Sequence, residues 1–239
     1  MPADTPARLV FLPGLACDER LWAAQLPAMP NALRPRVADV SRRHGSIEAM
    51  ARALLDEEEG PLLLAGASMG GMVAMEAARQ APERVAGLAL LGTSPLPETP
   101  EMYALRSAAI EEFAAGRAEA VIRTNVAFAF HPTNATDPAL VQRYLAMVLD
   151  AGAEQLIRQN RAVMARPDAR LHLGDLRCPV LLICGEADRL TPPDCTHAMA
   201  ALIPQAEVVW LPEAGHMLTM EAPEAVNAAL LRWLAPFLR

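Results

Sequence analysis

The chain has 239 residues, of which 53% are hydrophobic and 21% charged, and its formal net charge is −7. This composition suits one α/β domain with an insertion and excludes disordered, collagen-like and coiled-coil chains. All 21 basic residues are arginines, which excludes chemistry that needs a lysine, such as a Schiff base. The acidic balance gives no electrostatic reason to expect binding to nucleic acid or to an anionic membrane.

The four cysteines form no CxxC pair, so we expect neither a zinc site nor a disulfide framework. The first apolar run stops at Pro13, and no run approaches the roughly 20 residues of a membrane span. No flavin, nucleotide or metal motif is visible. We therefore expect a cytoplasmic protein that uses no cofactor and no metal and does not associate with membranes; the sequence leaves its oligomeric state open.

Six short apolar runs alternate with segments of helical periodicity along the chain. The predicted strands are Leu9–Leu12, Arg36–Val40, Leu62–Ala65, Val85–Leu91, Val180–Cys184 and Glu207–Leu211. The predicted helices between and after them are Cys17–Pro27, Ser46–Glu58, Met69–Gln80 and Pro223–Leu238. Continuous apolar runs are typical of strands covered on both faces, and strand–helix alternation produces right-handed crossovers. The pattern predicts an α/β fold with an open, mainly parallel sheet of about six strands flanked by helices.

A Gly-x-Ser-x-Gly pattern, Gly66-Ala67-Ser68-Met69-Gly70, lies between the third strand and the helix that follows it. Glycines at both ends allow a sharp turn that presents the Ser68 hydroxyl at the carboxyl edge of the sheet. The helix N-terminus behind it favours developing negative charge. The alternative is a small-residue turn that packs a helix close to a sheet. The strand before and the helix after it favour a nucleophile.

A long segment separates the fourth strand from the fifth, and it contains four predicted helices: Pro100–Ala115, Arg117–Phe130, Asp137–Leu149 and Ala151–Ala165. A structureless loop of this length is improbable. We expect residues 94–173 to form a helical cap and residues 1–93 and 174–239 to form the core. Phe128 and Met147 are candidates for an apolar acyl pocket, and Arg123 and Arg158 for binding a substrate carboxylate. The alternatives are cap core for the first pair and solvated surface for the second.

Asp188 follows the fifth strand and His216 follows the sixth, so both are expected at the edge of the sheet that carries Ser68. A serine nucleophile needs a base, and the base needs an acid that orients it. Glu186 and Asp194 remain rival candidates for that acid. Met217, directly after the histidine, is a further pocket candidate.

An oxyanion hole needs two backbone N–H groups. The residue after the nucleophile, Met69, supplies one in this reading. Leu15, in the loop after the first strand, supplies the other, because Gly14 allows the chain to turn and present the next amide.

The segments LPGL, GASMGG, GEADRLTPP and EAGHMLTMEAPEAV, in this order, resemble the α/β-hydrolase superfamily of serine hydrolases. The resemblance covers nearly the whole chain. It implies that Ser68 is the nucleophile, His216 the base and Asp188 the acid, beneath a helical cap. One departure is Pro13-Gly14, where many members have His-Gly.

The resemblance implies a serine hydrolase that cleaves a small-molecule carboxylic ester through an acyl-enzyme intermediate. Two alternatives stay open. One is a C–C bond hydrolase or lyase of the same fold, and the other is a non-catalytic receptor for a small ligand. The natural substrate and its acyl chain length are not specified by these residues.

Overall fold

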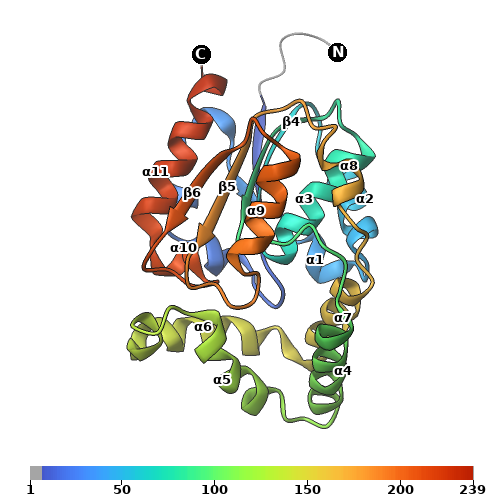
Figure 1. Cartoon of the computed structure of the whole chain (residues 1–239), viewed down its shortest axis with the longest axis vertical. Coiled ribbons are helices and arrows are strands. Elements are labelled where there is room, and N and C mark those ends of the chain that lie inside the picture. Colours follow the sequence, from blue (N-terminus) through green and yellow to red (C-terminus); the bar gives the residue numbers. More distant parts are fainter. Residues whose placement is uncertain (1–6, 239) are drawn as a thin grey trace.

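The computed structural model describes residues 7–238, which are built around a six-stranded sheet whose neighbouring strands are all parallel (Figure 1). The strands are β1 (Arg8–Leu12), β2 (Arg36–Val37), β3 (Leu62–Ala67), β4 (Val85–Leu91), β5 (Val180–Gly185) and β6 (Glu207–Leu211). Their order across the sheet is β2-β1-β3-β4-β5-β6. The predicted parallel α/β sheet is therefore confirmed, and β3 and β5 are buried along their whole length.

Alternate residues of the central strands point into two separate hydrophobic cores. Phe11 and Leu63 face the core that contains α11 (Pro223–Leu234) and α10 (Leu218–Glu221). Val10 and Leu64 face the core beneath α2 (Ile47–Glu57), α3 (Met69–Gln80), α8 (Arg170–Leu173) and α9 (Pro193–Leu202). This two-sided burial explains why the strands read as continuous apolar runs rather than alternating ones.

Five helices of residues 7–238 lie between β4 and β5. Besides the short α8 there are four longer helices, which Figure 1 shows gathered beyond one end of the sheet. They are α4 (Pro100–Ala114), α5 (Ala118–Ala129), α6 (Pro138–Asp150) and α7 (Gly152–Met164), with a 3₁₀ turn η4 (Asn134–Thr136) before α6. The side chains of Thr99 and Asp137 cap α4 and α6, and a proline opens each of these two helices. Sequence analysis predicts all four helices. No helix of residues 7–238 is long and apolar enough to cross a membrane.

Three predicted elements differ from the structure. The helix expected over Cys17–Pro27 is replaced by two 3₁₀ turns, η1 (Glu19–Trp22) and η2 (Leu26–Ala28). Asp18 caps the first turn, and Pro27 has no N–H with which to continue a helix. A third turn, η3 (Asn31–Leu33), precedes β2.

The strand expected over Arg36–Val40 ends at Val37, because the chain enters a helical turn, α1 (Val40–Arg43). Asp39 accepts two hydrogen bonds from Arg43, four residues later, which supports this turn. At the end of the chain, α11 passes into a 3₁₀ turn, η5 (Ala235–Leu238), short of the continuous helix predicted to Leu238.

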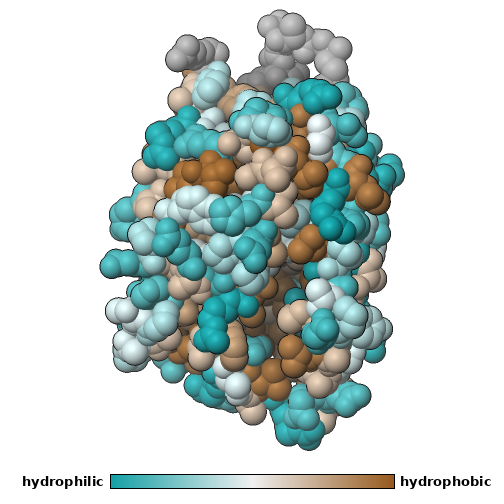
Figure 2. All heavy atoms as spheres, viewed as in Figure 1, coloured by the Kyte–Doolittle hydropathy of each residue, from teal (hydrophilic) through white to brown (hydrophobic). Residues whose placement is uncertain are grey.

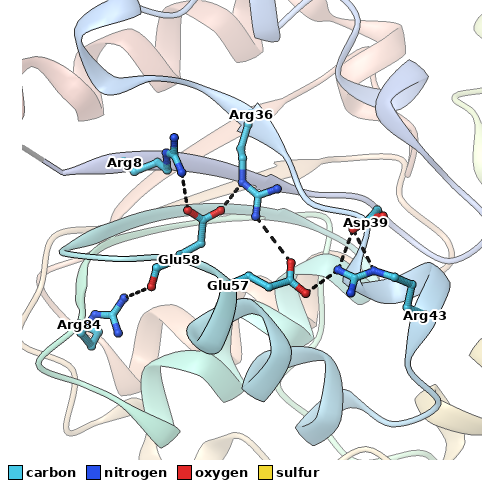
Figure 3. A network of polar contacts seen from close by, with 7 residues as sticks. All are labelled: Arg8, Arg36, Asp39, Arg43, Glu57, Glu58 and Arg84. Carbon is cyan, nitrogen blue, oxygen red and sulfur yellow. Dashed lines mark hydrogen bonds and ion pairs between the residues drawn. The ribbon is translucent and has the colours of Figure 1, made fainter.

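A network of ion pairs joins the edge of the sheet to the end of α2 (Figure 3). The Glu58 carboxylate is fully buried and pairs with Arg8 of β1 and Arg36 of β2. Its backbone oxygen accepts a hydrogen bond of 2.5 Å from Arg84, which precedes β4. Glu57 extends the network to Arg36 and, at 2.6 Å, to a fourth arginine, Arg43 of α1. Glu58 therefore connects three strand ends with the C-terminus of α2.

We expect Glu58→Gln to lower the free energy of unfolding by about 2 kcal/mol, because two guanidinium groups lose their charged partner. Glu59→Gln is the matched control, since Glu59 is exposed. Urea denaturation followed by circular dichroism measures both variants. Equal stability of the two would show that the network contributes nothing to the fold.

Candidate active site

The sharp turn between β3 and α3 places Ser68 in a backbone conformation that residues other than glycine rarely adopt. Its φ is 52° and its ψ is −118°. A Cβ on Gly66 would lie 2.3 Å from the backbone oxygen of Gly70, and one on Gly70 would lie 2.0 Å from that of Leu12. Only glycine fits at either position, so the packing of α3 against β1 and β3 holds Ser68 in its strained geometry.

The structure brings Ser68, His216 and Asp188 together in one chain of hydrogen bonds. Ser68 Oγ lies 2.9 Å from His216 Nε2, and His216 Nδ1 lies 2.8 Å from Asp188 Oδ2. Asp188 follows β5 and His216 follows β6, so the carboxyl ends of three strands supply the three groups. The rival acids, Glu186 and Asp194, are both exposed, and neither contacts the histidine.

The Asp188 carboxylate is 3% exposed and fully engaged in hydrogen bonds. Oδ1 accepts from the backbone N–H groups of Leu190 and Thr191, both at 2.9 Å, and Oδ2 accepts from the Thr191 hydroxyl at 2.8 Å. Burial by itself raises the pKa of Asp188, but the charge of His216 and the hydrogen bonds from His216 and Thr191 outweigh it, so the pKa lies below its ordinary value. The carboxylate therefore stays ionised at neutral pH and orients the His216 ring.

The loop that carries His216 is fastened to the chain that joins α5 to α6. The Glu221 carboxylate accepts hydrogen bonds from the backbone N–H of Gly215 at 2.9 Å and of His131 at 2.7 Å. It also accepts one of 2.9 Å from the side chain of Asn134. A Cβ on Gly215 would lie 2.6 Å from the nitrogen of His131, so the two segments touch directly. Sequence analysis did not identify Glu221, because nothing in the sequence marks a contact across 90 residues.

The backbone N–H groups of Leu15 and Met69 make no hydrogen bond within residues 7–238, and both residues line the cavity that contains Ser68. A Cβ on Gly14 would lie 3.3 Å from Ser68 Cβ, which places the loop after β1 beside the serine. Ala16, the residue after Leu15, donates its N–H to Gln159 Oε1 at 2.6 Å, which anchors this loop to α7.

Ser68 and His216 open into a cavity of about 640 Å³ between the sheet and helices α4–α7. Figure 2 shows a recess with apolar side chains in the lower half of the molecule, where Figure 1 places these helices. The apolar residues in its wall include Leu21, Met72, Met102, Ala109, Phe113, Ile122, Val148 and Leu156. The cavity can therefore bury an apolar group next to the serine hydroxyl.

Two of the five pocket candidates from the sequence line this cavity, and three do not. Phe128 and Met217 form part of its wall. Met147 of α6 is buried in the hydrophobic core but is not part of the cavity wall. Arg123 pairs with Glu119 on the exposed side of α5, and Arg158 donates to the backbone oxygen of Arg42. The expectation that these three residues bind substrate is therefore corrected.

The structure adds two polar residues that sequence analysis missed. Arg106 lines the cavity from α4, one turn after Met102 and one turn before Ala109, which also line it. A charged residue within an apolar helical stripe was the available signal. Thr191 lies against both Asp188 and, at 3.2 Å, His216 Nδ1. Its position in a loop gave no comparable signal.

Comparison with known proteins shows matches along nearly the whole chain. The pattern of the alpha/beta hydrolase family matches residues 9–229. The dihydrolipoyllysine-residue acetyltransferase component of an acetoin cleaving system from Pseudomonas putida is 32% identical over 95% of this chain, which spans 63% of that relative's length. The pimeloyl-[acyl-carrier protein] methyl ester esterase of Aromatoleum aromaticum is 32% identical over 90% of this chain and 93% of its own.

Among solved structures, a thermophilic esterase from Thermogutta terrifontis, with malate bound, is similar throughout. It superposes with a TM-score of 0.83 at 28% sequence identity, covering 98% of this chain and 91% of its own.

We expect a fluorophosphonate probe to label Ser68, because its hydroxyl is hydrogen-bonded to His216 Nε2 and lines the cavity. Ser68→Ala and His216→Gln should both abolish labelling. Ser107→Ala is the control, since Ser107 lies outside the wall of this cavity and its hydroxyl donates to the backbone oxygen of Tyr103. Intact mass and peptide mapping measure the adduct. An adduct on any other residue would contradict the assignment of Ser68.

Proposed function

Because the chain belongs to the alpha/beta hydrolase family, we propose that it is a serine hydrolase that cleaves carboxylic esters of small molecules through an acyl-enzyme intermediate. The observation that carries this proposal is the hydrogen-bonded series Ser68–His216–Asp188, with distances of 2.9 and 2.8 Å. Relatives and a structural neighbour named as esterases support the choice of an ester bond.

In the proposed reaction, Ser68 Oγ attacks the ester carbonyl carbon while His216 Nε2 takes its proton. Asp188 remains ionised and stabilises the imidazolium that forms. The carbonyl oxygen becomes negatively charged in the tetrahedral intermediate, and the free N–H groups of Leu15 and Met69 stabilise it. The N-terminus of α3, which begins at Met69, adds a favourable dipole.

Collapse of the intermediate breaks the bond to the alcohol, and His216 gives its proton to the departing oxygen. The acyl group is then bound to Ser68. A water molecule attacks this acyl-enzyme with His216 again acting as base, and the carboxylic acid leaves as the serine regains its proton.

The two other readings are weaker. A receptor would need the cavity but not a base hydrogen-bonded to the serine, so the contact between Ser68 and His216 favours an enzyme. A C–C hydrolase or lyase would use the same three residues, and no feature of the cavity wall favours it over an ester hydrolase.

We propose that residues 94–173 act as a cap, and that residues 1–93 and 174–239 form the catalytic core. Helices α4, α5, α6 and α7 each supply side chains to the wall of the cavity, whereas the proposed catalytic groups come from loops after the strands. A cap of this kind excludes water from the serine and strengthens the contacts to the developing oxyanion. It would also select the substrate, because it forms most of the surface that an acyl group contacts.

We expect the protein to hydrolyse 4-nitrophenyl acetate or butanoate, and Ser68→Ala to abolish this activity. Asp188→Asn should lower kcat about 10⁴-fold with little change in KM, because the histidine loses its orienting charge. Glu186→Gln is the control and should stay within about tenfold of wild type, since Glu186 is exposed. Undiminished hydrolysis by the Ser68→Ala variant would overturn the proposed function.

We expect Phe128→Ala to change the ratio between kcat/KM for the octanoate ester and kcat/KM for the acetate ester about tenfold. The reason is that loss of the phenyl ring from the wall enlarges the cavity. Met147→Ala is the matched control. It removes a buried side chain outside the cavity, so it should lower stability without changing this ratio. An unchanged ratio in the Phe128 variant would show that the cap does not select the acyl group at this position.

A further inference from the structure

Arg106, an arginine with an unused hydrogen-bond donor, lies in the mainly apolar wall of the cavity. The side chain of Arg106 is 25% exposed and lines the cavity from α4. Its Nε donates to Glu98 Oε2 at 2.7 Å, and its Nη1 donates to Asn160 Oδ1 at 2.9 Å. Its Nη2 makes no hydrogen bond within residues 7–238 and is not one of the buried atoms that lack a partner. Two anchors thus fix the guanidinium and leave one nitrogen accessible.

The charges around Arg106 do not balance. The side chain of its carboxylate partner, Glu98, is 5% exposed and also pairs at 2.9 Å with Arg166. The side chain of Arg166 is 7% exposed. A partly buried guanidinium group, that of Arg106, and a buried one, that of Arg166, therefore share one carboxylate, which leaves one positive charge. Burial lowers the pKa of Arg106, which shows that the cation is destabilised where it lies. A buried charge of this kind is stable when a counter-ion meets it.

The other charged residues of the cavity wall are already engaged or exposed. Glu112 is held by two hydrogen bonds from Arg117, so it is a poor acceptor for Arg106 or for a ligand. Arg189 is exposed and packs over the ring of Phe128 at 4.7 Å. Arg106 is therefore the partly buried cation of the cavity wall, and two hydrogen bonds hold it in place.

We propose that Arg106 binds a carboxylate of the substrate, so that the enzyme acts on esters that carry a second, anionic carboxylate group. This inference rests on the proposed ester hydrolase function. The single unbalanced charge matches a monoanion such as a carboxylate better than a phosphate dianion. A charge-assisted hydrogen bond from Nη2 is stronger here than in bulk water, because the surrounding wall is mainly apolar.

The first test compares two substrates of similar length, 4-nitrophenyl hydrogen glutarate and neutral 4-nitrophenyl pentanoate. We expect wild type to have a kcat/KM at least about tenfold higher for the charged ester. Arg106→Met should lower this value about 10- to 100-fold and leave the neutral ester within about threefold. This variant should fold, because Glu98 keeps Arg166 as its partner. A second pair, 4-acetoxybutanoate and butyl acetate, tests a carboxylate on the alcohol side.

Two further variants locate the effect. Arg123→Met is the matched control, since Arg123 pairs with Glu119 outside the cavity, and it should leave both rates unchanged. Arg189→Met tests the exposed arginine at the cavity wall. The inference is overturned if Arg189→Met removes the preference for charged esters while Arg106→Met does not. It is also overturned if wild type shows no such preference in either substrate pair.

The second test measures binding without turnover. Isothermal titration of glutarate into the Ser68→Ala protein should give an affinity that Arg106→Met weakens about 10- to 100-fold. If both esters are hydrolysed equally and glutarate binding does not depend on Arg106, this inference fails and the proposed function stands. If no ester is hydrolysed but glutarate binding requires Arg106, the carboxylate site stands and the proposed function fails.

Discussion

The close approach of α3 to the ends of β1 and β3 is the constraint on which the rest of the site depends. Gly70 lies directly against the backbone of Leu12. The hydroxyl of Thr93, which follows β4, donates to the backbone oxygen of Ser68 at 2.7 Å. Three loops therefore meet at the serine. This packing fixes the strained Ser68, brings the amide of Leu15 beside it, and leaves the ends of β5 and β6 to supply Asp188 and His216.

The parallel sheet and the positions of these three residues could be predicted because they depend on local rules. A buried parallel strand reads as an apolar run, and residues directly after such strands meet at one edge of the sheet. The Gly66-to-Gly70 spacing adds a steric requirement that few other structures impose. Where a single sequence pattern determines the geometry, as for the parallel sheet, the predicted and observed folds agree.

The misassigned residues depend partly on contacts between distant segments and partly on local interactions. Arg123 and Arg158 were plausible carboxylate ligands from their sequence positions alone. In the structure, Arg123 pairs with Glu119 and Arg158 donates to the backbone oxygen of Arg42. The residues from Cys17 to Pro27 have helical spacing, yet a capping Asp18 and a proline divide them into short turns. Glu221 was not predictable, because one of the two backbone N–H groups that it binds, that of His131, lies 90 residues away along the chain.

The attachment of Glu221 to both Gly215 and His131 has a mechanical consequence. Met217 also donates its N–H to the oxygen of Ala129 at 3.0 Å, so the junction between α5 and α6 is fastened on both sides of His216. Any rotation of the insertion about this junction would move the imidazole as well. Substitutions in the helices before and after the junction are therefore tolerated more readily than changes in residues 129–134. The position of the His216 imidazole, which the chemistry requires, depends on those residues.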